Sequence, residues 1–196
     1  MILTASSSSF ESAPSGVHPA RLYRIVDMGT QTSEYQGQTK HQRKLSLSFE
    51  LLGDERMADS KPFTISRRFT ASLSDKAALL AFIVQWRGKA FTDEDLARGF
   101  DLKRLLGQAC LLNLTETERD GKHYTNIASI SPLPKGMPKP DGVNDVQLFD
   151  LNVPDWDVFE QLSERMREQI ASSPEYQALP LTKATTETPF DDAEGF

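Results

Sequence analysis

Apolar and polar side chains alternate with a period of two along three stretches in the first half of the chain. The stretches run from Val17 to Met28, from Lys40 to Leu51 and from Phe63 to Ala71. A period of two places successive side chains on opposite faces of a strand. The pattern therefore predicts a three-stranded meander, and the polar stretch from Gly29 to Gly37 predicts the loop between its first two strands.

The period changes to that of a helix after the third stretch. Ser74 and Asp75 predict a helix N-terminus, and apolar residues recur at helical spacing as far as Trp86 before Gly88. Two shorter helical turns follow, the first opened by Thr92 and the second capped by Asp101. We therefore expect a helical insertion after the third strand.

Two further strands follow, at residues 110–117 and 123–130, and Asp120-Gly121 predicts a hairpin turn between them. The order β-β-β-α-β-β is that of an OB-fold, a five-stranded Greek-key barrel with a helix between its third and fourth strands. An SH3-like barrel is the main alternative, and a helix of about a dozen residues at this position disfavours it. The predicted fold class is therefore mainly β.

The composition divides the chain into three regions. Residues 1–16 are rich in serine and predict a flexible N-terminal arm, and residues 17–140 form the predicted OB-fold domain. Residues 141–196 form an acidic C-terminal region. Within it, apolar residues at helical spacing predict a helix over 155–171, and we expect the polar remainder, residues 172–196, to be disordered with a flexible tip.

The negative charge is concentrated in the C-terminal region. Residues 1–140 hold 19 Lys and Arg against 15 Asp and Glu, whereas residues 141–196 hold 3 against 13. A mildly basic body favours binding to a polyanion, although the whole chain has a pI of about 5.1. The acidic tail predicts a second function, the recruitment of partner proteins.

The outer face of the second and third strands is where an OB-fold binds single-stranded nucleic acid, together with the loops that flank it. Such a face needs cations for phosphates and exposed aromatic rings for bases. We expect the DNA-binding residues to be Arg21, Tyr23, Tyr35, Lys40, Arg43, Lys44, Arg67, Arg68, Arg119, Lys122 and Tyr124. Solvated surface charge is the alternative interpretation of each cation, and packing in the core is the alternative for each aromatic residue.

Signals of catalysis are weak. The acidic run Asp93-Glu94-Asp95 is typical of the first turn of a helix, and the three histidines lack the spacing of metal ligands. Cys110 lies in an apolar strand-like run, which predicts a buried, unreactive thiol. We therefore expect no enzyme activity, no metal and no cofactor, and no membrane-spanning or targeting segment. The predicted location is the cytoplasm, that of the host cell if a phage encodes the chain.

Several segments resemble those of a bacteriophage family of single-stranded DNA-binding proteins. They are Gly16-Val17-His18 leading into Arg21, Trp86 to Thr92, Phe100 to Gly107, Tyr124 to Ile127 and Ser131 to Met137, and the resemblance covers about residues 16–180. It implies an OB-fold that coats single-stranded DNA during phage DNA replication or recombination.

The tail is similar to that of bacterial single-stranded DNA-binding proteins, which end in an acidic peptide whose last residues are Pro-Phe. Asp191, Asp192, Glu194 and Phe196 form the corresponding partner-binding group, with Gly195 where the proline would stand. The resemblance implies that replication or repair proteins are the partners. A solubilising tail is the alternative.

We therefore expect a sequence-independent single-stranded DNA-binding protein. Two alternatives remain open at this point: an OB-fold protein-interaction adaptor without strong DNA affinity, and a strand-annealing recombination factor that would need self-association.

Overall fold

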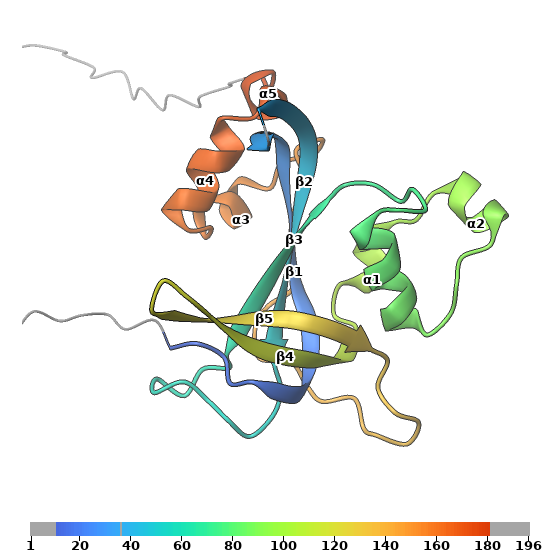
Figure 1. The fold of residues 1–196 in the computed structure, drawn as a ribbon, viewed down its shortest axis with the longest axis vertical. Coiled ribbons are helices and arrows are strands. Elements are labelled where there is room, and N and C mark those ends of the chain that lie inside the picture. The colour runs from blue at the N-terminus through green and yellow to red at the C-terminus, as the bar shows by residue number, and fades with distance from the viewer. Residues whose placement is uncertain (1–10, 36, 181–196) are drawn as a thin grey trace, which may run out of the picture.

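A computed structural model describes residues 11–35 and 37–180, except for the side chain of Tyr35 (Figure 1). The partner-binding residues predicted in the tail lie outside this range. Five strands form one open antiparallel sheet in the order β3-β2-β1-β4-β5. Their bounds are β1 Gly16–Tyr35, β2 Gln38–Leu51, β3 Thr64–Thr70, β4 Ala109–Arg119 and β5 Lys122–Ser131. A sixth strand, β6 (Gln147–Phe149), pairs with β1 in the parallel direction.

The predicted element order is confirmed, including the helices between the third and fourth strands. These are α1 (Ala78–Arg87), α2 (Asp93–Arg98) and the 3-10 helix η1 (Leu102–Leu105). Thr92 and Asp95 form a capping box at the start of α2, as the acidic first turn indicates. Helix α1, however, begins after Ala77, which makes no side-chain cap, and not at Ser74.

The main hydrophobic core lies between the sheet and α1. Phe49 on β2 contacts both Phe82 and Trp86 on α1, with ring centroids 6.1 and 5.6 Å apart. The indole nitrogen of Trp86 also donates to the carbonyl of Ala109 at 3.2 Å, which fixes α1 against β4. Phe49, Phe82 and Trp86 are all buried. Phe49 therefore points into the core, as the alternation of apolar and polar residues along this strand indicates.

A second hydrophobic cluster joins the C-terminal region to the sheet. Val26 and Met28 on β1 pack against Phe149, Leu162 and Ile170. The helices that supply this cluster are α3 (Trp156–Glu160), α4 (Glu164–Ala171) and α5 (Pro174–Gln177). In Figure 1 they lie together beside the β1–β2 end of the sheet, on the opposite side from α1 and α2.

Three local expectations need correction. The stretch from Gly29 to Tyr35 is strand and not loop, because β1 continues and pairs with β2 as far as Tyr35–Gln38. The helix expected over 155–171 forms two helices, α3 and α4, separated at residues 161–163. Residues 172–180, expected to be disordered, contain α5 and pack on β1. Likewise, Ala13 from the predicted flexible arm is buried in the main core.

Within residues 11–35 and 37–180, no helix has both the length and the apolar character that crossing a bilayer requires.

Candidate nucleic-acid interface

The outer face of β3 carries exposed polar side chains at every second position. Thr64, Ser66 and Arg68 are exposed, whereas Ile65 and Phe69 point into the core. This alternation of exposed and buried side chains is the one that the sequence predicts for the strand. Arg68 thus lies on an accessible surface at one edge of the sheet.

The same face of β2 is much less accessible than predicted. Ser46, Ser48 and Glu50 are fully buried. The hydroxyl of Ser48 is hydrogen-bonded to that of Ser66 at 2.8 Å, and Lys44 Nζ donates to Thr70 Oγ1 at 2.9 Å. Cross-strand neighbours on β1 and β3, and the segments that follow β5, cover these small residues. The candidate surface is therefore narrower than two full strands.

Arg21 is fixed in a buried ion pair, so its predicted role in contacting DNA conflicts with its surroundings. Its Nε donates to Glu50 Oε1 at 2.6 Å, and the Glu50 side chain has no solvent exposure. Glu50 Oε2 also accepts from the backbone N of Val143 and Asn144 and from the Asn144 side chain, at 2.7–3.2 Å. A buried carboxylate needs a cation beside it, and Arg21 stands directly opposite in the β1–β2 register.

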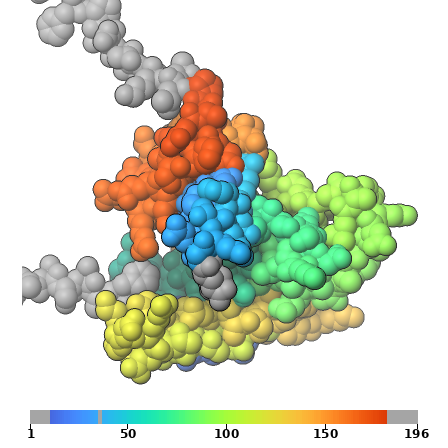
Figure 2. Space-filling view, turned by 45° about the horizontal axis from the view of Figure 1, so that its top comes forward, coloured from blue at the N-terminus to red at the C-terminus, as the bar shows by residue number. Residues whose placement is uncertain are grey.

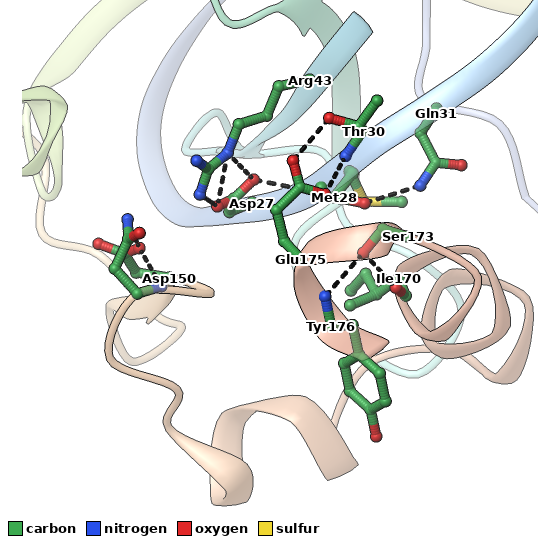
Figure 3. Close-up of polar contacts among 12 residues, drawn as sticks. Asp27, Met28, Thr30, Gln31, Arg43, Asp150, Ile170, Ser173, Glu175 and Tyr176 are labelled. Atoms are coloured by element: carbon green, nitrogen blue, oxygen red, sulfur yellow. Dashed lines mark hydrogen bonds and ion pairs between the residues drawn. The ribbon is translucent and has the colours of Figure 1, made fainter. Parts of the chain in front are cut away.

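Arg43 is paired in the same way at the other end of the strands (Figure 3). Its guanidinium contacts the carboxylate of Asp27 through both Nε and Nη2, and Asp27 is buried. The hydrogen bond to Asp27 raises the pKa of Arg43 against the opposing effect of burial. Its positive charge is therefore largely neutralised within the protein.

Arg68, in contrast, has no carboxylate beside it in the described part of the chain. Its Nη2 donates to Gln169 Oε1 of α4 at 2.8 Å. Partial burial lowers the pKa of Arg68, and the positive charge of Arg165 on α4 lowers it further. Neither arginine forms an ion pair in the described chain, and two neighbouring cations in this state favour an anionic ligand. A hollow of about 420 Å³ opens beside Arg68, with Lys44, Gln31 and Gln169 in its lining.

Arg24 belongs to the same face, although its position in the sequence does not indicate this. The β1–β2 register shifts between Leu22 and Arg24, and this bulge puts Arg24 opposite Ser48 and in line with Ser66. Its guanidinium carbon lies 5.3 Å from the centre of the Tyr23 ring. The buried Nε of Arg24 and that of Arg167 on α4 have no hydrogen-bond partner. We call Arg24, Lys44, Arg68 and Arg165 the basic face; no contact within the described residues places Arg167 on it.

Polar contacts attach α4 and α5 to β1 and thereby hold Arg165 of α4 near the sheet (Figure 3 shows those of Thr30 and Gln31). Gln31 Nε2 donates to the carbonyls of Met28 and Gln169 at 2.7 and 2.8 Å. Glu175 accepts from the Thr30 backbone N at 2.8 Å and from its hydroxyl at 2.6 Å. Helix α4 is therefore held against the sheet by specific polar contacts on β1.

Gly29 allows this close approach. Its φ of +66° is favourable for glycine, and a Cβ at this position would lie 2.4 Å from the Cβ of Ser173. Ser173 in turn is fully buried and caps α5 by accepting from the Tyr176 backbone N at 3.3 Å. A glycine predicted to begin a loop is thus the contact point between β1 and the C-terminal helices.

The β4–β5 hairpin supplies the other border of the face. Figure 2 shows this hairpin, in yellow, standing apart from the C-terminal helices, in orange, with a hollow between them. Asp120 and Gly121 both have positive φ, which confirms the predicted tight turn. The predicted contacts Arg119, Lys122 and Tyr124 are exposed here, and Arg119 makes a long ion pair of 3.8 Å with Asp120.

The remaining candidates have different surroundings. Tyr23 is 7% exposed, so the prediction that its ring is available for stacking is wrong; the bulge that exposes Arg24 buries it. Arg67 lies at the rim of the core, where Nη1 donates to the carbonyl of Ile127 at 3.1 Å and links β3 to β5. Lys40 is exposed on β2, and the side chain of Tyr35 lies outside the described residues.

No cluster of three or more His, Cys, Asp or Glu side chains suited to a metal ion occurs in the described ranges. Cys110 is buried as predicted, and burial raises the pKa of its thiol. Neither observation bears on the absence of catalysis, which stays a prediction.

No known protein-family model matches this chain, and comparison with curated proteins finds no significant match. The resemblance to phage single-stranded DNA-binding proteins is therefore left as a prediction.

Proposed function

We propose that the protein binds single-stranded DNA without sequence preference, through the basic face and the adjoining β4–β5 hairpin. The observation that carries this proposal is the group of arginines on β1, β3 and α4 that have no acidic partner among the described residues. Arginines in this state bind phosphates and release condensed counterions, and this term is independent of sequence.

The strand order supports an OB-fold as the framework for this function. Strands β3 and β5 are the two edges of the open sheet, and the Arg67–Ile127 hydrogen bond links them. Closing these edges would complete a five-stranded barrel with α1 between its third and fourth strands. In that fold the outer face of β3 and the β4–β5 hairpin border the nucleic-acid path, and both carry exposed cations here.

The proposed mechanism uses phosphate contacts more than base stacking. Arg68 and Arg165 would bind phosphates at the edge of α4, and Arg24 would bind the next along the face. Tyr124, which is 47% exposed, is the aromatic candidate for a base on the described surface. Such binding coats DNA during phage replication or recombination, and the acidic tail would recruit replication or repair proteins.

A protein-interaction adaptor is the second candidate, and the burial of β2 favours it. Segment 141–144 covers the end of β2 at Glu50, and α4 presents exposed Glu164 and Glu168 close to Arg165. Both features reduce the positive potential available to DNA. A strand-annealing factor would need contacts between copies in addition.

Fluorescence anisotropy of a labelled oligo-dT of about 30 nucleotides tests the proposal at two salt concentrations, against a duplex of equal length. We expect tight, salt-dependent binding to the single strand and weaker binding to the duplex. With about five phosphates contacted, log K should fall with log salt at a slope of roughly −3.5. Absence of binding at low salt would favour the adaptor.

The site itself is tested with Arg68→Ala plus Arg165→Ala. Removing two phosphate contacts should reduce the salt slope by about 1.4 and weaken binding at low salt. The matched control is Lys135→Ala plus Lys139→Ala, which removes the same charge from the exposed proline-rich segment after β5. Equal losses in both variants would show that net charge, and not the basic face, drives binding.

A further inference from the structure

A second basic pocket lies in the helical insertion, away from the basic face. It has a volume of about 430 Å³ and is lined by three arginines, three apolar residues and one acid, Asp95. The arginines are Arg87 at the end of α1, Arg98 on α2 and Arg104 on η1, and the apolar residues are Phe91, Phe100 and Leu105. The charge of Arg87 acts on Asp95, and the net charge of the lining is +2. Figure 1 shows α2 on the opposite side of the β1–β2 strands from α4 and α5. The proposed DNA-binding surface does not account for this pocket.

Two of its three arginines have no carboxylate bound to them in the described chain. Arg98 pairs with Asp95 at 3.1 Å. The guanidinium carbon of Arg87 instead lies 4.1 Å from the centre of the Phe91 ring and 5.9 Å from that of Phe100. This stacking orients Arg87, and the edges of a stacked guanidinium stay free to donate to a carboxylate.

The pocket is better suited to an acidic peptide than to DNA bases. The guanidinium of Arg87 occupies one face of Phe91, so that face is closed to a base, and Phe100 meets Phe91 edge to face at 5.2 Å. The Phe rings and Leu105 instead offer an apolar floor beside two unpaired cations. A ligand with carboxylates next to an aromatic side chain would satisfy both parts.

This chain contains such a segment. Residues 188–196 place Asp191, Asp192 and Glu194 between Phe190 and Phe196. The described structure ends at Pro180, after α5, on the side of the sheet opposite the pocket. The seven residues 181–187 that precede this segment can extend by roughly 25 Å, which is enough to reach an adjacent molecule in contact with this one. A neighbouring copy can present its pocket directly, whereas a path within one molecule must pass around the β1–β2 strands.

We propose that the pocket formed by Arg87, Arg104, Phe91 and Phe100 binds the acidic segment 188–196 of a second copy of the chain. This contact would link successive copies of the chain. The linking of successive copies rests on the proposed DNA-binding function. The peptide–pocket interaction itself requires no DNA. The acidic tail would then bind both the pocket of the next copy and the partner proteins that we expect it to recruit.

The first experiment titrates a labelled peptide of residues 181–196 into the full-length chain whose own tail is neutralised by Asp191→Ser, Asp192→Ser and Glu194→Ser. Arg87→Glu plus Arg104→Glu in that chain should weaken peptide binding by about tenfold or more. Arg104→Glu alone, at an exposed position without a described ion pair, should give a smaller loss and guards against misfolding of the double variant. Absence of peptide binding to the parent chain would overturn the proposal.

Lys135→Glu plus Lys139→Glu is the matched control, because it makes the same change in net charge at exposed sites outside the pocket. Peptide affinity should change by less than about twofold, in keeping with screening of distant surface charges. Equal weakening in the control and in the pocket variant would show that the peptide responds to net charge alone.

A mixing experiment distinguishes a second copy from the same molecule. The pocket variant with an intact tail and the tail variant with an intact pocket should associate when mixed, while each alone stays monomeric in analytical ultracentrifugation. Peptide binding without association of the mixture would place the contact within one molecule and overturn the second-copy proposal.

DNA binding by the pocket variant distinguishes a failure of the peptide-docking proposal from a failure of the DNA-binding proposal. The pocket variant should keep wild-type affinity for an oligo-dT of about ten nucleotides, which lies within the site size of one OB-fold. A loss on this short oligonucleotide would assign the pocket to DNA and contradict the peptide-docking role.

Discussion

Arg21 and Arg24 lie three residues apart on β1, yet their surroundings are opposite. Arg21 is bound to Glu50, a carboxylate that is fully buried and also accepts from three nitrogen donors of segment 143–144. Arg24 has a buried Nε with no acceptor and faces the outer row of β3. The first arginine is bound in an ion pair within the fold, whereas the second has no ion pair in the described chain and is the one proposed to contact a ligand.

The same contrast recurs further along the sheet, where Arg43 is paired with buried Asp27 and Arg68 has Arg165 as its charged neighbour. A carboxylate that loses water on folding needs a cation, so the position of buried acids determines which arginines are structural. The buried acids Glu50 and Asp27 therefore determine which arginines have a structural role.

Arg21→Ala should be the most destabilising of the substitutions that test this contrast. It leaves the buried charge of Glu50 without its cation, at a cost of about 3–5 kcal/mol in the free energy of unfolding. Urea denaturation measures the loss. The double variant Arg21→Leu with Glu50→Leu removes both charges and should recover much of it, whereas a loss below about 1 kcal/mol for Arg21→Ala would contradict a structural role.

Gly29→Ala should detach the C-terminal helices from the sheet. A Cβ there would overlap Ser173, and alanine at a left-handed φ adds strain, so we expect a cost of about 2 kcal/mol. Limited proteolysis should show faster cleavage between α4 and α5 than in the parent chain. Because Arg165 would also lose its position, the salt slope for single-stranded DNA should fall in parallel; an unchanged slope would exclude α4 from the basic face.

Glu175 makes the same attachment dependent on pH. Burial acts to raise its pKa, but the hydrogen bonds from the Thr30 side chain and backbone outweigh this and, with the charge of Arg43, lower the pKa overall. A carboxyl whose pKa is lowered by folding stabilises the protein above its unfolded pKa of about 4.3 and loses that contribution as the pH falls further. The hydrogen-exchange protection of α5, measured relative to the intrinsic exchange rate at each pH, should therefore fall below about pH 4.

Glu175→Ala should remove this acid sensitivity and cost about 1.5–3 kcal/mol at neutral pH, the range for hydrogen bonds to a charged group. Identical acid dependence of α5 exchange in the variant and in the parent would show that another group controls the attachment.

Arg24→Ala should have the smallest effect on stability, within about 0.5 kcal/mol, because no ion pair of Arg24 is lost. Its effect should appear in the salt dependence of DNA binding, where the slope should fall by about 0.7 for one phosphate contact. A stability loss close to that of Arg21→Ala would remove the distinction between the two arginines.

The sequence predicts the strands and helices well where the period is regular. The order of elements, the Asp120-Gly121 turn and the outward row of β3 are all confirmed. The extension of β1 through residues 29–35 could not be predicted, because its polar residues are equally typical of a loop. Only the pairing of residues 29–35 with β2 makes this stretch a strand and not a loop.

The candidate site was harder to predict, for two physical reasons. The bulge between Leu22 and Arg24 exchanges the faces of β1, so Tyr23 is buried and Arg24 is brought onto the outer face. Arg165 joins the face through tertiary packing of α4, which no local pattern contains. One signal was present: Arg165 is one of three cations in the acidic region. Whether the face binds DNA stays a prediction.

The chain has two tryptophans, one inside the main core and the other at the edge of the second cluster. Trp86 is 5% exposed in the main core, whereas Trp156 is 45% exposed beside Phe159 and Tyr176 in the second cluster. Their intrinsic emission should therefore differ in wavelength, with the Trp86 component bluer than that of Trp156. Single-tryptophan variants would give each cluster its own optical reporter, so that release of the C-terminal helices could be followed in real time while the sheet remains folded.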